Sequence, residues 1–116
     1  LRAGISQREF LFFNQELRAL LRAGLPIVPS LEILIERRKN KVFRALLIDI
    51  RERVKGGEAL SEAFKAQGDM FPPLYSASLA SGERSGELAQ VLERFVTYLH
   101  KTIAIRRKVT SGLDSR

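Results

Sequence analysis

The residues that could perform acid–base, nucleophilic or metal chemistry are few, and they do not pair with one another. His100 is the single histidine and cysteine is absent, so thiolate sites and two-histidine devices are excluded. Ser78, Ser81 and Ser85 lie close together in the sequence. A serine nucleophile needs a positioned base, however, and tight packing and helix capping explain these serines better. The sequence therefore predicts no catalytic residue, no metal ligand and no cofactor.

A glycine-bounded segment, Gly82-Glu83-Arg84-Ser85-Gly86, is the second candidate for chemistry. A phosphate-binding loop needs a preceding strand and a glycine followed by Lys and Ser or Thr, and the sequence offers neither. The segment instead predicts a turn between two helices. In that turn we expect Gly86 to adopt a backbone shape that side chains disfavour, and Glu83 to accept backbone hydrogen bonds at a helix end.

Four basic residues form the third candidate: Lys101, Arg106, Arg107 and Lys108. Favourable cation placement at a helix C-terminus would explain them without any partner. A nucleic-acid patch would also explain them, but such patches usually interleave aromatic residues, and none lies between residues 101 and 116. A third explanation is a basic cluster just before a helix enters the bilayer. Because the chain begins and ends in mid-pattern, we favour the third explanation and expect the chain to be a piece of a longer protein.

Capping residues, glycines and prolines divide the chain into helices, with no run of strand-like alternation. Ser6 and Glu9 have the spacing of a capping box, which begins the first helix, and Gly24 follows its end. Ser61 is the expected cap of the fourth helix. The predicted helices span residues 7–23, 29–38, 41–55, 60–67, 73–82 and 86–110. They indicate an all-α fold: an antiparallel six-helix bundle with a long C-terminal helix.

Apolar residues recur at intervals of three and four along these helices and define the expected core. The fifth helix is rich in small residues, from Ser76 to Ser81, so we expect a close backbone approach by a neighbour. The last helix presents a longer apolar stripe than a small bundle needs. We expect this stripe to form an interface between copies of the chain, in a dimer or a higher oligomer. Its residues are Val91, Phe95, Leu99 and Ile103.

Length and charge bound the remaining possibilities. The 116 residues suit one domain, residues 1–116, and 45% hydrophobic residues is globular composition. A net charge of +7 favours anionic partners: nucleic acid, an anionic membrane surface or an acidic protein. No apolar run approaches the roughly 20 residues that a membrane-spanning helix needs.

Several motifs, in order along residues 10–100, resemble the F domain family of type II secretion, which is shared with the PilC platform proteins of type IV pili. The first is the helix and turn from Gln15 to Pro26, and the second is the segment from Val54 to Ser61. Phe71-Pro72 matches a Phe-Pro step. The most specific match is Gly-Glu-x-Ser-Gly-x-Leu, at residues 82–88. The residues that carry these motifs are Gly24, Pro26, Gly57, Pro72, Gly82, Glu83, Gly86 and Leu88.

The resemblance implies a non-enzymatic role at the cytoplasmic face of the bacterial inner membrane. Family members are multi-pass platform proteins with two copies of this domain, and the chain resembles the first copy. The implied partners are the cytoplasmic assembly ATPase, other inner-membrane pilus or secretion components, and pilins, with no nucleic acid. The family often has acidic residues around the tyrosine matched by Tyr98, where this chain has Thr97 and His100. We therefore do not expect the cation site that some relatives carry there. The alternative from another class is a basic helical module that binds nucleic acid.

Overall fold

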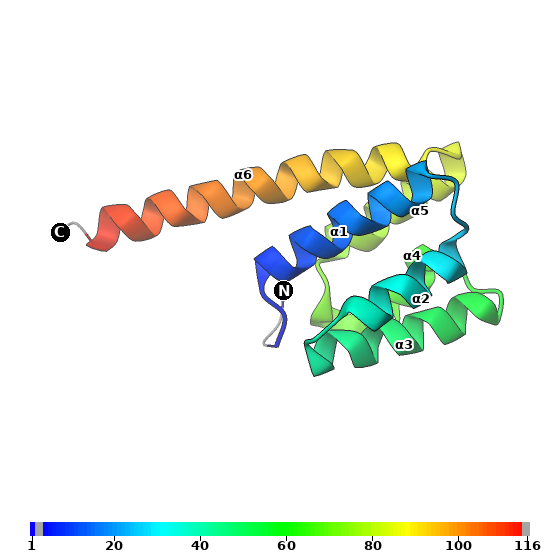
Figure 1. Ribbon diagram of the computed structural model, residues 1–116. Helices are drawn as coiled ribbons and strands as arrows, with labels where there is room; N and C mark the ends of the chain where they lie inside the picture. Colours follow the sequence, from blue (N-terminus) through cyan, green and yellow to red (C-terminus); the bar gives the residue numbers. More distant parts are fainter. Residues whose placement is uncertain (2–3, 115–116) are drawn as a thin grey trace.

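The chain is all-helical in a computed structural model that describes residue 1 and residues 4–114 (Figure 1). The described residues form helices and one short 3₁₀ turn joined by short connections, and no strand occurs among them. The predicted all-α fold with a long last helix is confirmed. In chain order the elements are α1 (Gln7–Arg22), α2 (Ile27–Arg37), α3 (Lys41–Lys55), α4 (Leu60–Lys65), η1 (Gly68–Met70), α5 (Pro73–Ser85) and α6 (Leu88–Asp114).

Two helices, α1 and α3, begin at residues whose side chains cap the helix. The hydroxyl of Ser6 accepts a hydrogen bond from the Glu9 N–H at 3.1 Å, and the Glu9 carboxylate accepts one from the Ser6 N–H at 3.4 Å. This reciprocal pair is the predicted capping box. At α3, the Asn40 side chain accepts a hydrogen bond from the Phe43 N–H at 3.1 Å. Each cap satisfies a backbone donor that the helix itself cannot pair.

The beginning of α2 and the N-cap of α4 differ from the prediction. α2 begins at Ile27, two residues early, because Pro29 falls in the first turn, where its missing N–H would have no helical partner. α4 begins at Leu60 with Ala59 at its N-cap, so the prediction that Ser61 caps this helix is wrong. Ser61 lies inside the first turn and is buried. α4 also ends at Lys65, before the separate η1 turn.

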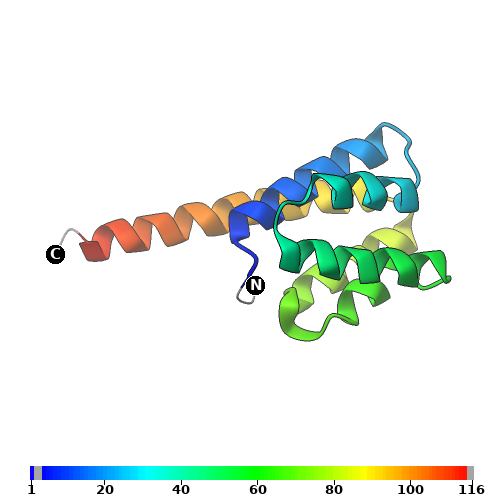
Figure 2. The same cartoon turned by 60° about the horizontal axis from the view of Figure 1, so that its bottom comes forward.

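The helices pack in an antiparallel order around one core (Figures 1 and 2). α1 packs against α6, which runs the opposite way, and against α2. α5 packs between α4 and α6, and α3 joins α2 to α4. The second half of α6 continues beyond this body, as both views show. The fold therefore consists of a packed helical body and a projecting end of α6.

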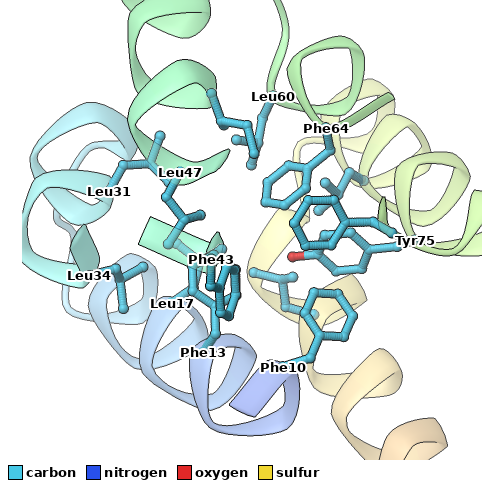
Figure 3. Packing of buried hydrophobic residues seen from close by; sticks show 14 of the residues in the cluster. Phe10, Phe13, Leu17, Leu31, Leu34, Phe43, Leu47, Leu60, Phe64 and Tyr75 are labelled. Carbon is cyan, nitrogen blue, oxygen red and sulfur yellow. The ribbon is translucent and has the colours of Figure 1, made fainter. Parts of the chain in front are cut away.

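Aromatic side chains join five helices at the centre of the body (Figure 3). Tyr75 of α5 contacts Phe10 of α1 at a ring-centroid distance of 4.7 Å, Phe64 of α4 at 5.0 Å and Phe95 of α6 at 5.0 Å. Phe13 contacts Phe43 of α3 at 5.2 Å. Edge-on and tilted pairs of this kind stabilise a core beyond the burial of their area. Leucines surround the rings, among them Leu17, Leu31, Leu34, Leu47 and Leu60.

Candidate functional site

The Gly-Glu-x-Ser-Gly segment is mostly helix, not turn. α5 continues through Gly82 and Glu83 to Ser85, and α6 begins at Leu88. The predicted boundaries, at residues 82 and 86, are therefore wrong, as is the prediction of a turn over all five residues. Only Gly86 leaves the helix, with φ +75°, and this left-handed conformation confirms the expectation for that glycine. The segment thus forms the last turn of α5 and a tight elbow into α6.

Gly82 brings α5 and α6 into direct backbone contact. A Cβ atom at this position would lie 2.9 Å from the Cα of Leu88 and 3.2 Å from a methyl group of Val91. No ordinary side chain fits there without separating the helices. Gly82 is therefore required by packing inside a helix. The close approach to a neighbour was expected from the small residues Ser76 to Ser81, whereas the structure shows it at Gly82.

Glu83 connects the elbow to α4. Its carboxylate accepts a hydrogen bond from the Ser61 N–H at 2.9 Å and another from the Ser61 hydroxyl at 2.5 Å. The N-cap of α4, Ala59, offers no side-chain acceptor, so Glu83 supplies one from another helix. The expectation that Glu83 accepts backbone hydrogen bonds at a helix end is confirmed. The helix end is that of α4, which sequence spacing alone did not identify.

The other motif residues lie at helix joints. Gly24 and Gly57 directly follow the C-caps of α1 and α3, and Pro26 and Pro72 are the N-cap residues of α2 and α5. Their types match these positions, since glycine favours helix ends and proline cannot continue a preceding helix. These four residues therefore lie where the chain passes from one helix to the next.

A buried polar pair, Asn14 and Tyr75, was missed by the sequence reasoning. The Tyr75 hydroxyl donates to the Asn14 side-chain oxygen at 2.7 Å, and the Asn14 amide donates to the Phe10 carbonyl at 2.9 Å. Both residues are fully buried, and Figure 3 shows the Tyr75 oxygen pointing into the core. Burial raises the pKa of the Tyr75 phenol well above its ordinary value. Asn14 lies on the apolar stripe of α1. A polar residue on that stripe is the one sequence signal that could have revealed the buried pair.

The apolar stripe of α6 is not the free surface that we expected. Val91, Phe95 and Leu99 are 4–5% exposed and pack against the body. The expectation that these residues form an interface between copies is wrong, because α1 and α5 already cover the stripe. Ile103, at the edge of the body, remains partly exposed. The exposed apolar residues of α6 lie elsewhere on the helix: Tyr98 at 47%, Ile105 at 61% and Val109 at 57%.

Several arginines of the body form ion pairs with carboxylates. Arg37 and Arg38 both bind Glu16, and the Arg38 side chain also lies over the rings of Phe13 and Phe43. Arg53 donates to Asp49 at 2.8 Å. A hydrogen bond from Gln67, followed by this contact with Arg53, holds the pKa of the Asp49 carboxyl below its ordinary value.

Lys101, Arg106, Arg107 and Lys108 lie exposed on the second half of α6. Within the described part of the chain, none of the four forms an ion pair. Arg106 and Arg107 line a shallow groove between α6 and the first turn of α1, with a volume of about 450 Å³. The other residues of this groove are Ser6, Gln7, Arg8, Ile103, Thr110 and Ser111. We call this feature the arginine groove.

His100 lies on the exposed side of α6, with its Nε2 atom 3.3 Å from the side-chain nitrogen of Gln15. The described residues contain no group of three or more His, Asp or Glu side chains placed to hold a metal ion. The helices described here also include none that is both long and apolar enough to span a bilayer.

The fold defines an all-helical domain with a tight α5–α6 elbow and a projecting basic helix. The chain belongs to the family described as type II secretion system protein F, whose model matches residues 13–113. The resemblance inferred from the motifs is therefore confirmed.

Curated relatives come from both pilus and secretion systems. A type IV pilus assembly protein PilC of Thermus thermophilus is 34% identical over 113 residues, covering 97% of this chain and 28% of the relative. A type II secretion system protein F of Xanthomonas campestris is 35% identical over 101 residues, covering 87% of this chain and 25% of the relative. A PilC of Myxococcus xanthus is 31% identical over 110 residues, covering 95% and 26%. The chain thus spans about a quarter of the length of these relatives.

Proposed function

We propose that this chain is the first cytoplasmic domain of a multi-pass inner-membrane platform protein for type IV pilus or type II secretion pseudopilus assembly. The observation that supports it most directly is the family match over residues 13–113, with relatives named for both systems. The domain acts as a non-enzymatic scaffold. It binds the cytoplasmic assembly ATPase, other inner-membrane components and pilins through the outer surfaces of its helices, and so keeps these partners in fixed positions relative to one another.

The architecture supports a scaffold that transmits movement. The α5–α6 elbow is fixed by the close approach of Gly82 to Leu88 and by the hydrogen bonds that Glu83 accepts from Ser61 of α4. α6 then continues as one helix from the core to the projecting basic end (Figure 1). A load on the body is therefore carried into α6, whose end we place next to the membrane.

Binding of the assembly ATPase tests the direct-contact part of the proposal. The immobilised chain should retain the purified ATPase from the same organism, and calorimetry should give a saturable isotherm. A cysteine-free bundle of similar charge serves as the matched control for non-specific attraction. Absence of binding by both methods would remove the ATPase from the proposed partners.

The role of the Gly-Glu-x-Ser-Gly segment in assembly is tested by substitutions in the full-length parent protein. Gly82→Leu should abolish pili or secretion, because the side chain separates α5 from α6. Gly112→Leu, at a position with open space around it, is the control and should retain assembly. Parent protein levels are followed by immunoblotting, and normal assembly by the Gly82 variant would contradict the role given to the elbow.

We also propose that copies of the domain associate. The supporting surface lies beside the buried stripe of α6, where Leu74 and Tyr98 are 50% and 47% exposed. They line a shallow groove of about 310 Å³ between α5 and α6. A second copy would bury these two side chains at little cost, since the groove is mostly apolar.

A further inference from the structure

We propose that the arginine groove binds the phosphate groups of anionic phospholipids and docks the second half of α6 on a bilayer surface. The inference rests on the membrane placement under the proposed function and deepens it by naming a lipid class and a site. Arg8, Arg106 and Arg107 are the residues that would carry the binding.

Two separate helices build the groove. Arg8 lies in the first turn of α1, and Arg106 and Arg107 lie on the α6 face that continues the buried stripe past the end of the body. Consecutive helical residues point about 100° apart, so Arg106 and Arg107 flank the line from Ile103 to Thr110. Guanidinium groups offer planar pairs of N–H donors that match phosphate oxygens. The hydroxyl of Thr110 adds another donor at the same groove.

The groove holds positive charge that no carboxylate offsets. Arg8, Arg106 and Arg107 form no ion pair within the described residues, whereas Arg22, Arg37, Arg38 and Arg53 all do. The sequence from Arg94 to Leu113 contains no Asp or Glu. Positive charges that share one groove repel one another. Binding of an anion in the groove therefore lowers the electrostatic energy of the domain.

The composition of α6 around the groove favours a lipid surface over nucleic acid. Ile105 and Val109, which are 61% and 57% exposed, lie on the opposite face of α6 and take no part in the groove. Binding of single-stranded nucleic acid relies on aromatic stacking, and no Phe, Tyr or Trp follows Tyr98 in the sequence.

Vesicle binding by charge-matched variants tests the site. The chain is sedimented with vesicles of phosphatidylcholine, with or without phosphatidylglycerol. The groove variant is Arg8→Gln/Arg106→Gln/Arg107→Gln. The control, Arg94→Gln/Lys101→Gln/Lys108→Gln, removes the same charge from residues seven apart on the opposite face of α6. Circular dichroism confirms that both variants remain helical.

Wild-type chain should bind only the vesicles that contain phosphatidylglycerol. The groove variant should lose about tenfold or more in affinity, and the control about threefold or less. Equal losses in the two variants would overturn the proposal, since net charge alone would then explain binding. Equal binding to pure phosphatidylcholine would also overturn it. So would duplex DNA binding that depends on the groove while vesicle binding is absent. The vesicle assay contains no ATPase. A negative result would therefore contradict the lipid site alone, and the platform role would still be tested by the separate ATPase-binding experiment.

Discussion

The Glu83 carboxylate, in the last turn of α5, accepts hydrogen bonds from both the backbone N–H and the hydroxyl of Ser61 in the first turn of α4. This contact joins the most specific motif of the sequence to a helix that begins more than twenty residues earlier. It also satisfies a backbone N–H in the first turn of α4, whose own N-cap residue, Ala59, has no side-chain acceptor. The glutamate of the motif therefore has a structural task that local turn geometry does not reveal.

Replacing Glu83 should destabilise the domain. In Glu83→Ala the buried Ser61 hydroxyl and one α4 backbone donor lose their acceptor, and we expect a loss of about 1–3 kcal/mol in the free energy of unfolding. Glu83→Gln keeps one acceptor oxygen and should lose less. Urea denaturation followed by circular dichroism measures the change. Glu36→Ala, an exposed position on α2, should stay within about 0.5 kcal/mol of wild type. A Glu83→Ala loss as small as that of the control would contradict the role of the contact.

A single methyl group at Gly82 should weaken the elbow. The added Cβ of Gly82→Ala meets the Leu88 backbone at 2.9 Å, so α5 and α6 must shift, and we expect a cost of about 1–3 kcal/mol. Gly112→Ala is the matched control, because its Cβ meets nothing within 4 Å and alanine favours helix. That variant should be neutral or slightly stabilised. Thermal melts compare the two proteins, and equal melting temperatures would refute the packing argument.

The stability of the domain should fall at high pH because of Tyr75. Its folded-state pKa is raised by burial, so above about pH 10 the unfolded chain releases a proton that the folded chain retains. Stability is then lost as the pH rises, by up to about 1.4 kcal/mol per pH unit. Tyr75→Phe should be less stable at neutral pH, since Asn14 loses its donor, but should lack this fall. Urea midpoints at rising pH test the difference. Tyr98→Phe serves as the control and should keep the fall.

Self-association should depend on Leu74 and Tyr98. Both side chains are exposed beside the same groove, so Leu74→Lys/Tyr98→Lys places charge where a second copy would bury apolar area. Light scattering at increasing concentration should show a dimer or larger species for wild type and a monomer for the variant. Val42→Lys, at another exposed apolar position, is the control. A wild type that remains monomeric at high concentration would rule out association of the isolated domain.

The sequence predicted the helices well wherever local chemistry decides. The capping box of Ser6 and Glu9 and the left-handed Gly86 follow from neighbours in the chain, and both expectations are confirmed. The errors arise where contacts between distant residues decide. α5 continues through Gly82, whose missing side chain leaves room for α6, and Ser61 donates to Glu83 instead of acting as a cap.

The surfaces were harder to predict than the elements. Periodicity showed that Val91, Phe95 and Leu99 share a face, but not that α1 and α5 cover it. The hydrogen bond between Asn14 and Tyr75 joins residues 61 positions apart, a distance over which helical spacing carries no information. The arginine groove likewise needs Arg8 of α1 beside α6, and only the tertiary arrangement places it there.

The uninterrupted length of α6 makes it a mechanical arm. A helix of 27 residues is about 40 Å long; its first half is held by α1 and α5, and its second half projects beyond the body. A tilt of about 10° in the held half would move the tip of the projecting half, about 20 Å away, by roughly 3 Å. A small rearrangement of the helices that hold α6 would therefore displace the basic tip by a few ångströms, and a partner or a membrane in contact with the tip would be displaced with it.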